Sequence, residues 1–138
     1  MKLEWKEEYS VKVGEIDEQH KKLFGFLNAM DELIRNNGPK SEALKLIEGL
    51  NDYADYHFET EEKYFEQFNY VGSDNHKKSH NDYRVKIGEF LEQINTVEDA
   101  TMTAFLFEIL DFLEDWWVNH ILDEDKKYTQ AFNNNGLS

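Results

Sequence analysis

The feature that most constrains the fold of this chain is a helical apolar period that recurs in four separate segments. Apolar residues return at intervals of three or four, which places them on one face of a helix. The four seams are Ile16, Leu23, Leu27, Met30 and Ile34; Leu50, Ala54, Phe65 and Phe68; Tyr83, Ile87, Phe90, Leu91 and Ile94; and Met102, Phe105, Leu106, Ile109, Leu113 and Trp116. Each helix therefore has a face that must be buried against the others.

Sequences that stop helices separate these segments. The stretch Asn36-Asn-Gly-Pro39 ends the first helix, expected over about 17–36, and Tyr70-Val-Gly-Ser73 ends the second, expected over about 41–68. These breaks argue against a long two-helix coiled coil. Because the connections are short, the sequence predicts an all-α, antiparallel up-down-up-down four-helix bundle.

The starts of the last two helices carry capping signals. Ser73 or Asp74 is the expected N-cap of the third helix. Thr96, with Asp99 three residues later, resembles a capping box at the start of the fourth, with Asp in place of Glu.

The chain of 138 residues fits one domain. We expect a single domain over 1–138, with an N-terminal arm over about 1–16, the bundle over about 17–122, and a C-terminal segment over about 123–138 that contains a short helix. Trp5, Tyr9 and Val13 are expected to pack the arm against the bundle.

Composition excludes several classes of function. The net charge is -14, with 29 acidic and 15 basic residues, so the surface repels nucleic acid and anionic membranes. The absence of cysteine excludes disulfides, thiolate zinc sites, iron–sulfur clusters and cysteine nucleophiles. There is no apolar leader and no run long enough to span a membrane. These features favour a cytoplasmic protein, and the acidity favours a monomer.

All five histidines of the chain lie on the apolar seams. His57 and Glu61 are four residues apart, which places both on one face of the second helix, and His76 and His80 form a similar pair on the third. A single inward histidine is usually a satisfied core residue. Histidines and a carboxylate that all face the core need a partner, and the natural partner is a metal ion.

The expected turns also bring these residues to matching heights. His20 and His57 both lie about 27 Å from the first turn at ~1.5 Å per residue, and Glu61 and His80 are level with respect to the second. His120 and Asp125 fit less well, because five residues correspond to about 140° around a regular helix. They can share a metal only if the helix breaks or widens just after His120.

Taken together, these residues resemble the hemerythrin family, and most closely the single-domain bacterial hemerythrins. The family pattern is one His on helix one, His-x3-Glu on helix two, His-x3-His on helix three and His-x4-Asp at the end of helix four. The matching residues are His20, His57 with Glu61, His76 with His80, and His120 with Asp125. Their surroundings match too, as in Val13-Gly-x-Ile-Asp-x-Gln-His20, His57-Phe-x-x-Glu-Glu62, Trp116-x-x-x-His-Ile121 and Asp125-x-x-Tyr128. The resemblance covers about residues 1–130.

The resemblance implies a non-haem di-iron protein that binds dioxygen reversibly as hydroperoxide at one open iron, and that is not an enzyme. It implies that His76, His80 and His120 complete one iron, that His20 and His57 leave the other iron one position open, and that Glu61 and Asp125 bridge the pair together with an oxo or hydroxo group. The absence of sulfur ligands suits iron, although manganese or zinc would also accept such a site. Apolar walls, with Phe24, Phe58, Trp116 and Ile121 as candidates, would keep water out.

Other functions of the same metal pair stay open at this point. They are a stress or detoxification role on peroxide, nitric oxide or iron, and an oxygen or redox sensor. Ferritin-like proteins need Glu-x-x-His on two helices, and no His here has Glu three residues before it. A metal-free bundle would leave five histidines in a core without an occupant. Three positions depart from the common family pattern, namely Phe65, Val71 and Trp117, and Trp117 adds bulk beside the expected site.

Overall fold

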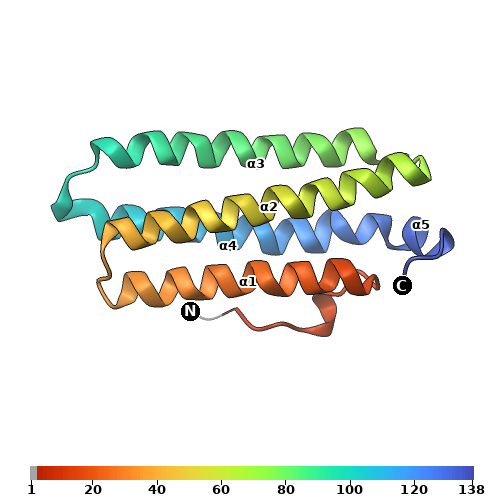
Figure 1. The fold of residues 1–138 in the computed structure, drawn as a ribbon, viewed down its shortest axis with the longest axis horizontal. Coiled ribbons are helices and arrows are strands. Elements are labelled where there is room, and N and C mark those ends of the chain that lie inside the picture. Colours follow the sequence, from red (N-terminus) through yellow and green to blue (C-terminus); the bar gives the residue numbers. More distant parts are fainter. Residues whose placement is uncertain (1–2) are drawn as a thin grey trace.

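The computed structural model describes residues 3–138 and contains four long antiparallel helices in up-down-up-down order (Figure 1). They are α1 (Gly14–Arg35), α2 (Lys40–Phe68), α3 (Ser73–Gln93) and α4 (Asp99–Asp123). A short helix, α5 (Thr129–Asn134), follows, and 3-10 turns occupy η1 (Glu7–Tyr9), η2 (Ile94–Thr96) and η3 (Asp125–Tyr128). No strand occurs within residues 3–138. The predicted all-α four-helix bundle is confirmed.

Left-handed asparagines end the first two helices. Asn37 has φ 55°, and the Gly38 N–H donates to the Leu33 carbonyl at 2.9 Å. Asn69 has φ 52°, and the Tyr70 N–H donates to the Phe65 carbonyl at 2.9 Å. Asparagine tolerates this conformation and takes the place of the more common glycine, so both helices end where the sequence predicts.

The predicted starts of three helices need correction. Helix α1 begins at Gly14 rather than near residue 17, because the Asp17 N–H already donates to the Val13 carbonyl at 2.9 Å. Gly72 is the N-cap of α3, and Glu98 is the N-cap of α4; neither makes a side-chain cap bond. The Thr96 hydroxyl instead donates to the carbonyl of Gln93, so it belongs to the end of the preceding helical segment.

The main core of the bundle is a continuous apolar cluster to which all four long helices contribute. On α4 the buried tryptophan is Trp117, which is 0 % exposed, whereas Trp116 is only partly buried. Trp116, which the sequence places on the core seam, packs against this cluster from its edge, and Trp117 is the tryptophan buried inside it. Helix α4 is apolar on most of its faces, with Phe105, Phe107 and Phe112 also partly buried, so its period could not distinguish two adjacent tryptophans.

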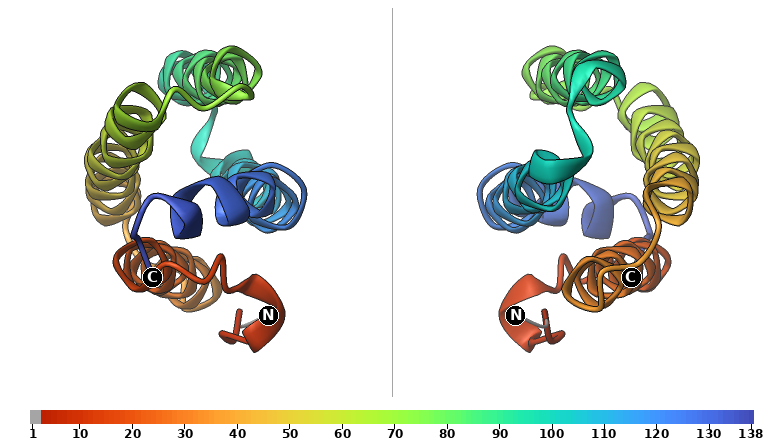
Figure 2. Two further views of the ribbon diagram at one scale, coloured as in Figure 1. Left: turned by 90° about the vertical axis from the view of Figure 1, so that its right-hand side faces the viewer. Right: turned by 90° about the vertical axis from the view of Figure 1, so that its left-hand side faces the viewer.

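The arm and the C-terminal segment close one end of the bundle. In the end-on views, the C-terminal helix crosses this end between the long helices (Figure 2). Buried apolar residues from both segments pack together with α1 and α2: Val11, Val13, Ile16, Phe65, Tyr128 and Phe132. The Thr129 hydroxyl donates to the Val11 carbonyl at 2.9 Å, so the two ends of the chain are joined directly.

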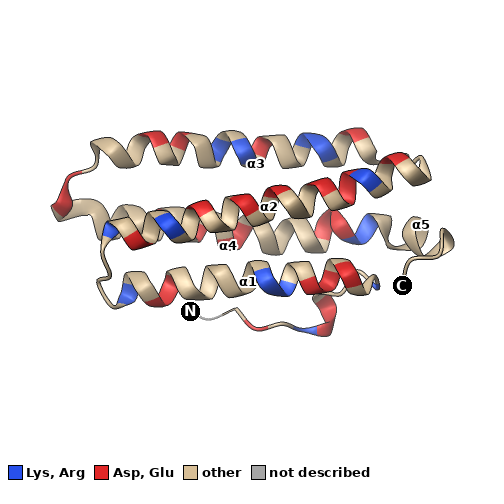
Figure 3. Cartoon of the chain, in the orientation of Figure 1, with Lys and Arg blue, Asp and Glu red and all other residues tan. Residues whose placement is uncertain are grey.

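The rest of the arm packs along α1. Tyr9 is buried with its ring 5.2 Å from the ring of Phe24, and Trp5 lies half-buried against both. The predicted inward packing of Trp5, Tyr9 and Val13 is confirmed. Charged residues are spread over the length of every long helix (Figure 3). Within the described part of the chain, no helix combines the length and the apolar character that crossing a membrane requires.

Candidate metal centre

The structure brings all seven candidate ligands together at the end of the bundle that the arm and C-terminal segment close. One comes from α1, two each from α2 and α3, one from α4 and one from η3: His20, His57 and Glu61, His76 and His80, His120, and Asp125. His120 is 4 % exposed, and the other six are 0–1 % exposed. Their donor atoms form two groups, and Glu61 belongs to both.

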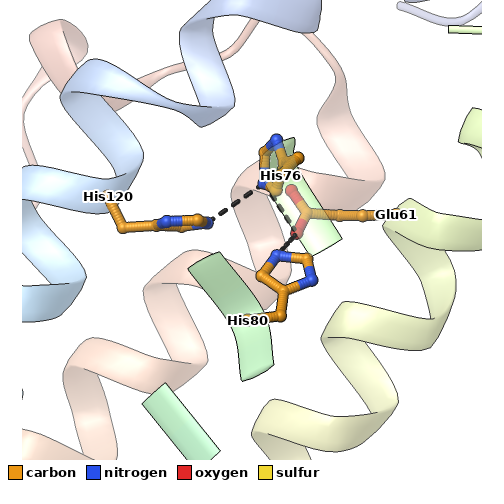
Figure 4. Close-up of side chains that lie close together, drawn as sticks. All are labelled: Glu61, His76, His80 and His120. Carbon is orange, nitrogen blue, oxygen red and sulfur yellow. Dashed lines mark hydrogen bonds and ion pairs between the residues drawn. The ribbon is translucent and has the colours of Figure 1, made fainter. Parts of the chain in front are cut away.

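The first group consists of Glu61, His76, His80 and His120 (Figure 4). The Nε2 atoms of His76 and His120 lie 3.1 Å apart. Glu61 Oε1 lies 3.2 Å from His80 Nε2 and 3.8 Å from His76 Nε2. Three imidazoles therefore direct the same nitrogen toward one carboxylate.

The second group consists of His20, His57, Glu61 and Asp125. The Nε2 atoms of His20 and His57 lie 3.1 Å apart, and His57 Nε2 lies 3.4 Å from Glu61 Oε1. His20 Nε2 lies 2.9 Å from Asp125 Oδ2. His20 on α1 therefore lies level with His57 on α2, and Glu61 on α2 lies level with His80 on α3, as expected from the sequence.

Asp125 faces both groups. Its Oδ1 lies 2.8 Å from His76 Nε2 and 3.0 Å from His120 Nε2, while its Oδ2 faces His20. Helix α4 continues to Asp123 before the chain tightens into η3, so the break comes later than directly after His120. The change from α-helix to 3-10 geometry turns Asp125 back toward the histidine.

The donor atoms fit a metal better than they fit one another. Two pairs of imidazoles meet through the same nitrogen, although only a protonated nitrogen can donate a hydrogen bond. Glu61 Oε1 and both oxygens of Asp125 are buried, and the nearby histidines approach them without hydrogen-bond geometry. Buried polar atoms rarely stay unsatisfied in this way, and converging lone pairs are what a bound cation requires.

Three further side chains orient the histidines from outside. Gln19 Oε1 lies 2.6 Å from Nδ1 of His57, and Glu62 Oε2 lies 2.8 Å from Nδ1 of His80. The Ser79 hydroxyl lies 3.0 Å from Nδ1 of His120. A proton on each Nδ1 leaves the Nε2 lone pair free to face the centre. Sequence reasoning assigned these residues no role; Gln19 and Glu62 lie in the quoted motifs beside His20 and Glu61, whereas Ser79 carries no comparable signal.

Burial and charge act in opposite directions on the histidines. Burial lowers the pKa of His57 to about 3, against the opposing charge of Glu61. Burial would also lower the pKa of His80, but the nearby carboxylates of Glu61 and Glu62 outweigh it and raise that pKa to about 9. Burial would raise the pKa of Asp125, but the charge and close approach of His120 hold it well below its ordinary value. The carboxylates of Glu61 and Glu62 therefore favour the protonated form of His80, whose proton a bound metal would have to displace.

The raised pKa of His80 predicts pH-dependent metal binding. A metal that takes Nε2 of His80 must displace its proton, so apparent zinc affinity should rise by about tenfold per pH unit between neutral pH and about 9, then level off. Replacing Glu62 by Gln removes one anion that raises this pKa, so the affinity should level off at a lower pH. Zinc titration against a chromophoric chelator at several pH values measures both, and the same levelling-off pH in the two proteins would contradict the assignment.

Comparison with known proteins agrees with this geometry. The family model described as "Hemerythrin HHE cation binding domain" matches residues 11–132. The chain belongs to the hemerythrin family. The matched range includes all seven candidate ligands, the orienting residues Gln19 and Glu62, and most of the C-terminal segment.

Known hemerythrins and their solved structures match this chain over most of its length. A bacteriohemerythrin from Clostridium acetobutylicum is 31% identical over 128 residues, covering 90% of this chain and 96% of the relative. A hemerythrin-like protein from Naegleria gruberi is 35% identical over 124 residues, covering 90% and 88%. The crystal structure of a wild-type hemerythrin superposes with a TM-score of 0.78 at 27% identity, covering 94% of this chain and 96% of that one.

Proposed function

We propose that this hemerythrin holds two non-haem iron ions and binds dioxygen reversibly, as a carrier, store or source of oxygen. The observation that carries the proposal is the pair of buried donor groups that share Glu61, with Asp125 facing both. His76, His80 and His120 would hold one iron, and His20 and His57 the other. Glu61 and Asp125 would bridge them, together with an oxo or hydroxo group.

The chemistry of the donors supports iron. Imidazole and carboxylate ligands without sulfur suit iron, and two carboxylates offset part of the charge of two buried cations. The group with two histidines offers fewer donors than the group with three, so its metal would keep a position open. When bound, the iron pair supplies the two electrons and the open position that reversible oxygen uptake needs.

The surrounding side chains exclude water from the site. Phe58 is 0 % exposed and stacks on the imidazole of His80, with ring centroids 3.9 Å apart. Phe24 and Ile121 are buried together under the arm. Trp116, also expected as a wall, stacks on the outer face of His120 with centroids 4.3 Å apart. A dry apolar enclosure slows loss of electrons to solvent, which favours reversible binding over turnover.

We also propose an oligomeric state and a domain organisation for this chain. A net charge of -14 opposes self-association, so we expect a monomer. We expect the whole chain, residues 1–138, to act as one hemerythrin-like domain, because the arm and the C-terminal segment both pack against the site end of the bundle.

The deciding experiment combines iron analysis with visible spectra of one sample. The protein is reduced without air, exposed to oxygen, and then purged. We expect two irons per chain and a colour that appears in oxygen and fades on purging. Irreversible decay to the ferric state would overturn reversible binding in favour of detoxification, and an iron-free protein after anaerobic loading would remove the oxygen chemistry altogether.

A further inference from the structure

We propose that Tyr128 is a positioning residue that holds Glu61 in place for metal binding. Its hydroxyl donates a 2.5 Å hydrogen bond to Glu61 Oε2, and both side chains are 0 % exposed. The inference rests on the proposed role of Glu61 as the carboxylate shared by two metals. It assigns a role to a residue three positions after Asp125, outside the set of seven ligands.

The bond divides the two oxygens of Glu61 between different partners. Oε1 faces the histidines, with His80 Nε2 at 3.2 Å and His57 Nε2 at 3.4 Å. Oε2 accepts the hydrogen bond that the Tyr128 hydroxyl donates. The carboxylate is thus fixed in rotation, because turning it would exchange a hydrogen-bonded oxygen for one that faces the imidazoles.

The Tyr128 ring is itself held rigidly. It stacks on Phe132 with centroids 4.1 Å apart and planes 13° apart, and it lies 5.7 Å from the ring of His76. Phe65 contacts it from α2 with centroids 5.8 Å apart. The hydroxyl therefore has little freedom to seek another acceptor, so the donor is preorganised rather than induced by a bound metal.

The same short turn supplies Tyr128 and Asp125. Both lie in η3, and the next residue, Thr129, bonds the arm through the Val11 carbonyl. This turn therefore contributes one carboxylate directly and orients the other through a hydrogen bond. Docking of the C-terminal segment onto the arm would therefore position the carboxylates of Asp125 and Glu61 together.

Tyr128→Phe tests the inference, because it removes the hydroxyl and keeps the ring. Outer partners of metal ligands typically contribute about 10–100-fold to metal affinity. We expect zinc to dissociate roughly 10–100-fold faster into excess chelator from this variant than from the parent protein. Tyr70→Phe is the matched control: Tyr70 belongs to the same aromatic cluster, with its ring 6.4 Å from Tyr128, and should leave the rate unchanged.

A second measurement separates positioning from general loosening and does not depend on oxygen chemistry. Proton NMR of the zinc-loaded parent should show a slowly exchanging, low-field hydroxyl proton, which persists in Tyr70→Phe and disappears in Tyr128→Phe. If the parent binds two zinc ions but lacks this proton, or if Tyr128→Phe releases zinc at the parent rate, the inference fails while the metal site stands. If Tyr128→Phe does not fold, the NMR of the parent and of Tyr70→Phe still decides. A parent protein that binds no metal overturns the proposed function and this inference with it.

Discussion

Replacing Glu61 by Gln is expected to abolish paired metal binding, with iron falling from the proposed two per chain to one or none. Glu61 is the only residue in both donor groups, and its Oε1 faces histidines from α2 and α3. An amide is neutral and a far weaker bridging ligand, so the two cations would lose a charge as well as a shared donor. Because loss of an outer partner alone costs about 10–100-fold in affinity, loss of this ligand should cost more.

Glu59→Gln is the matched control for that change. It makes the same substitution two residues earlier on α2, at an exposed position. Its iron content and oxygen-dependent spectrum should equal those of the parent. Iron analysis and circular dichroism on all three proteins separate loss of ligand from loss of fold. A folded Glu61→Gln protein that still held two irons and bound oxygen reversibly would defeat the assignment of Glu61.

Replacing Trp117 by Ala is expected to have the largest effect on stability and on access to the site. Trp117 is fully buried, its ring stacks on Phe58 at 5.5 Å, and it lies 5.9 Å from the ring of His57. Its indole N–H also approaches the Tyr83 hydroxyl at 3.4 Å. Truncation should lower the free energy of unfolding by about 3–5 kcal/mol, since buried tryptophans leave large cavities.

The cavity would open beside His57, a proposed ligand of the iron that we expect to bind oxygen. We therefore expect azide to bind the ferric protein faster in Trp117→Ala and the oxygenated form to decay faster. Stopped-flow spectra and chemical denaturation measure the two effects. Trp116→Ala provides the comparison, because it removes the same side chain from a half-buried position on the outer face of His120. If Trp116→Ala lost more stability than Trp117→Ala, the assignment of Trp117 as the core tryptophan would be wrong.

These two experiments concern features that the sequence revealed to different degrees. The spacing of His57 and Glu61, and of His76 and His80, is local, because four residues on a helix define one face whatever the rest of the chain does. The order of breaks and seams likewise predicts how α1, α2 and α3 align. The sequence alone therefore identifies those residues and their relative heights along the bundle.

The choice between Trp116 and Trp117 was of another kind. Both are large and apolar, and α4 has apolar side chains on most of its faces, so no local pattern distinguishes them. Both tryptophans contact Phe58 and Tyr83, and the way α4 docks in the bundle decides that Trp117 is the buried one, facing His57. The predicted helix cap at Thr96 was wrong for a similar reason, because the Thr96 hydroxyl donates to a carbonyl of the preceding turn.

By itself, the sequence determined the helical bundle, the absence of cysteine chemistry, and the ordered set of histidines and carboxylates that marks the family. Only the tertiary structure decided how Asp125 reaches both groups, and which side chains orient the ligands. Gln19 meets His57, Ser79 meets His120 and Tyr128 meets Glu61 across different elements. Periodicity reports the face on which a residue lies, whereas these contacts depend on how separate helices and turns dock, which no local spacing encodes.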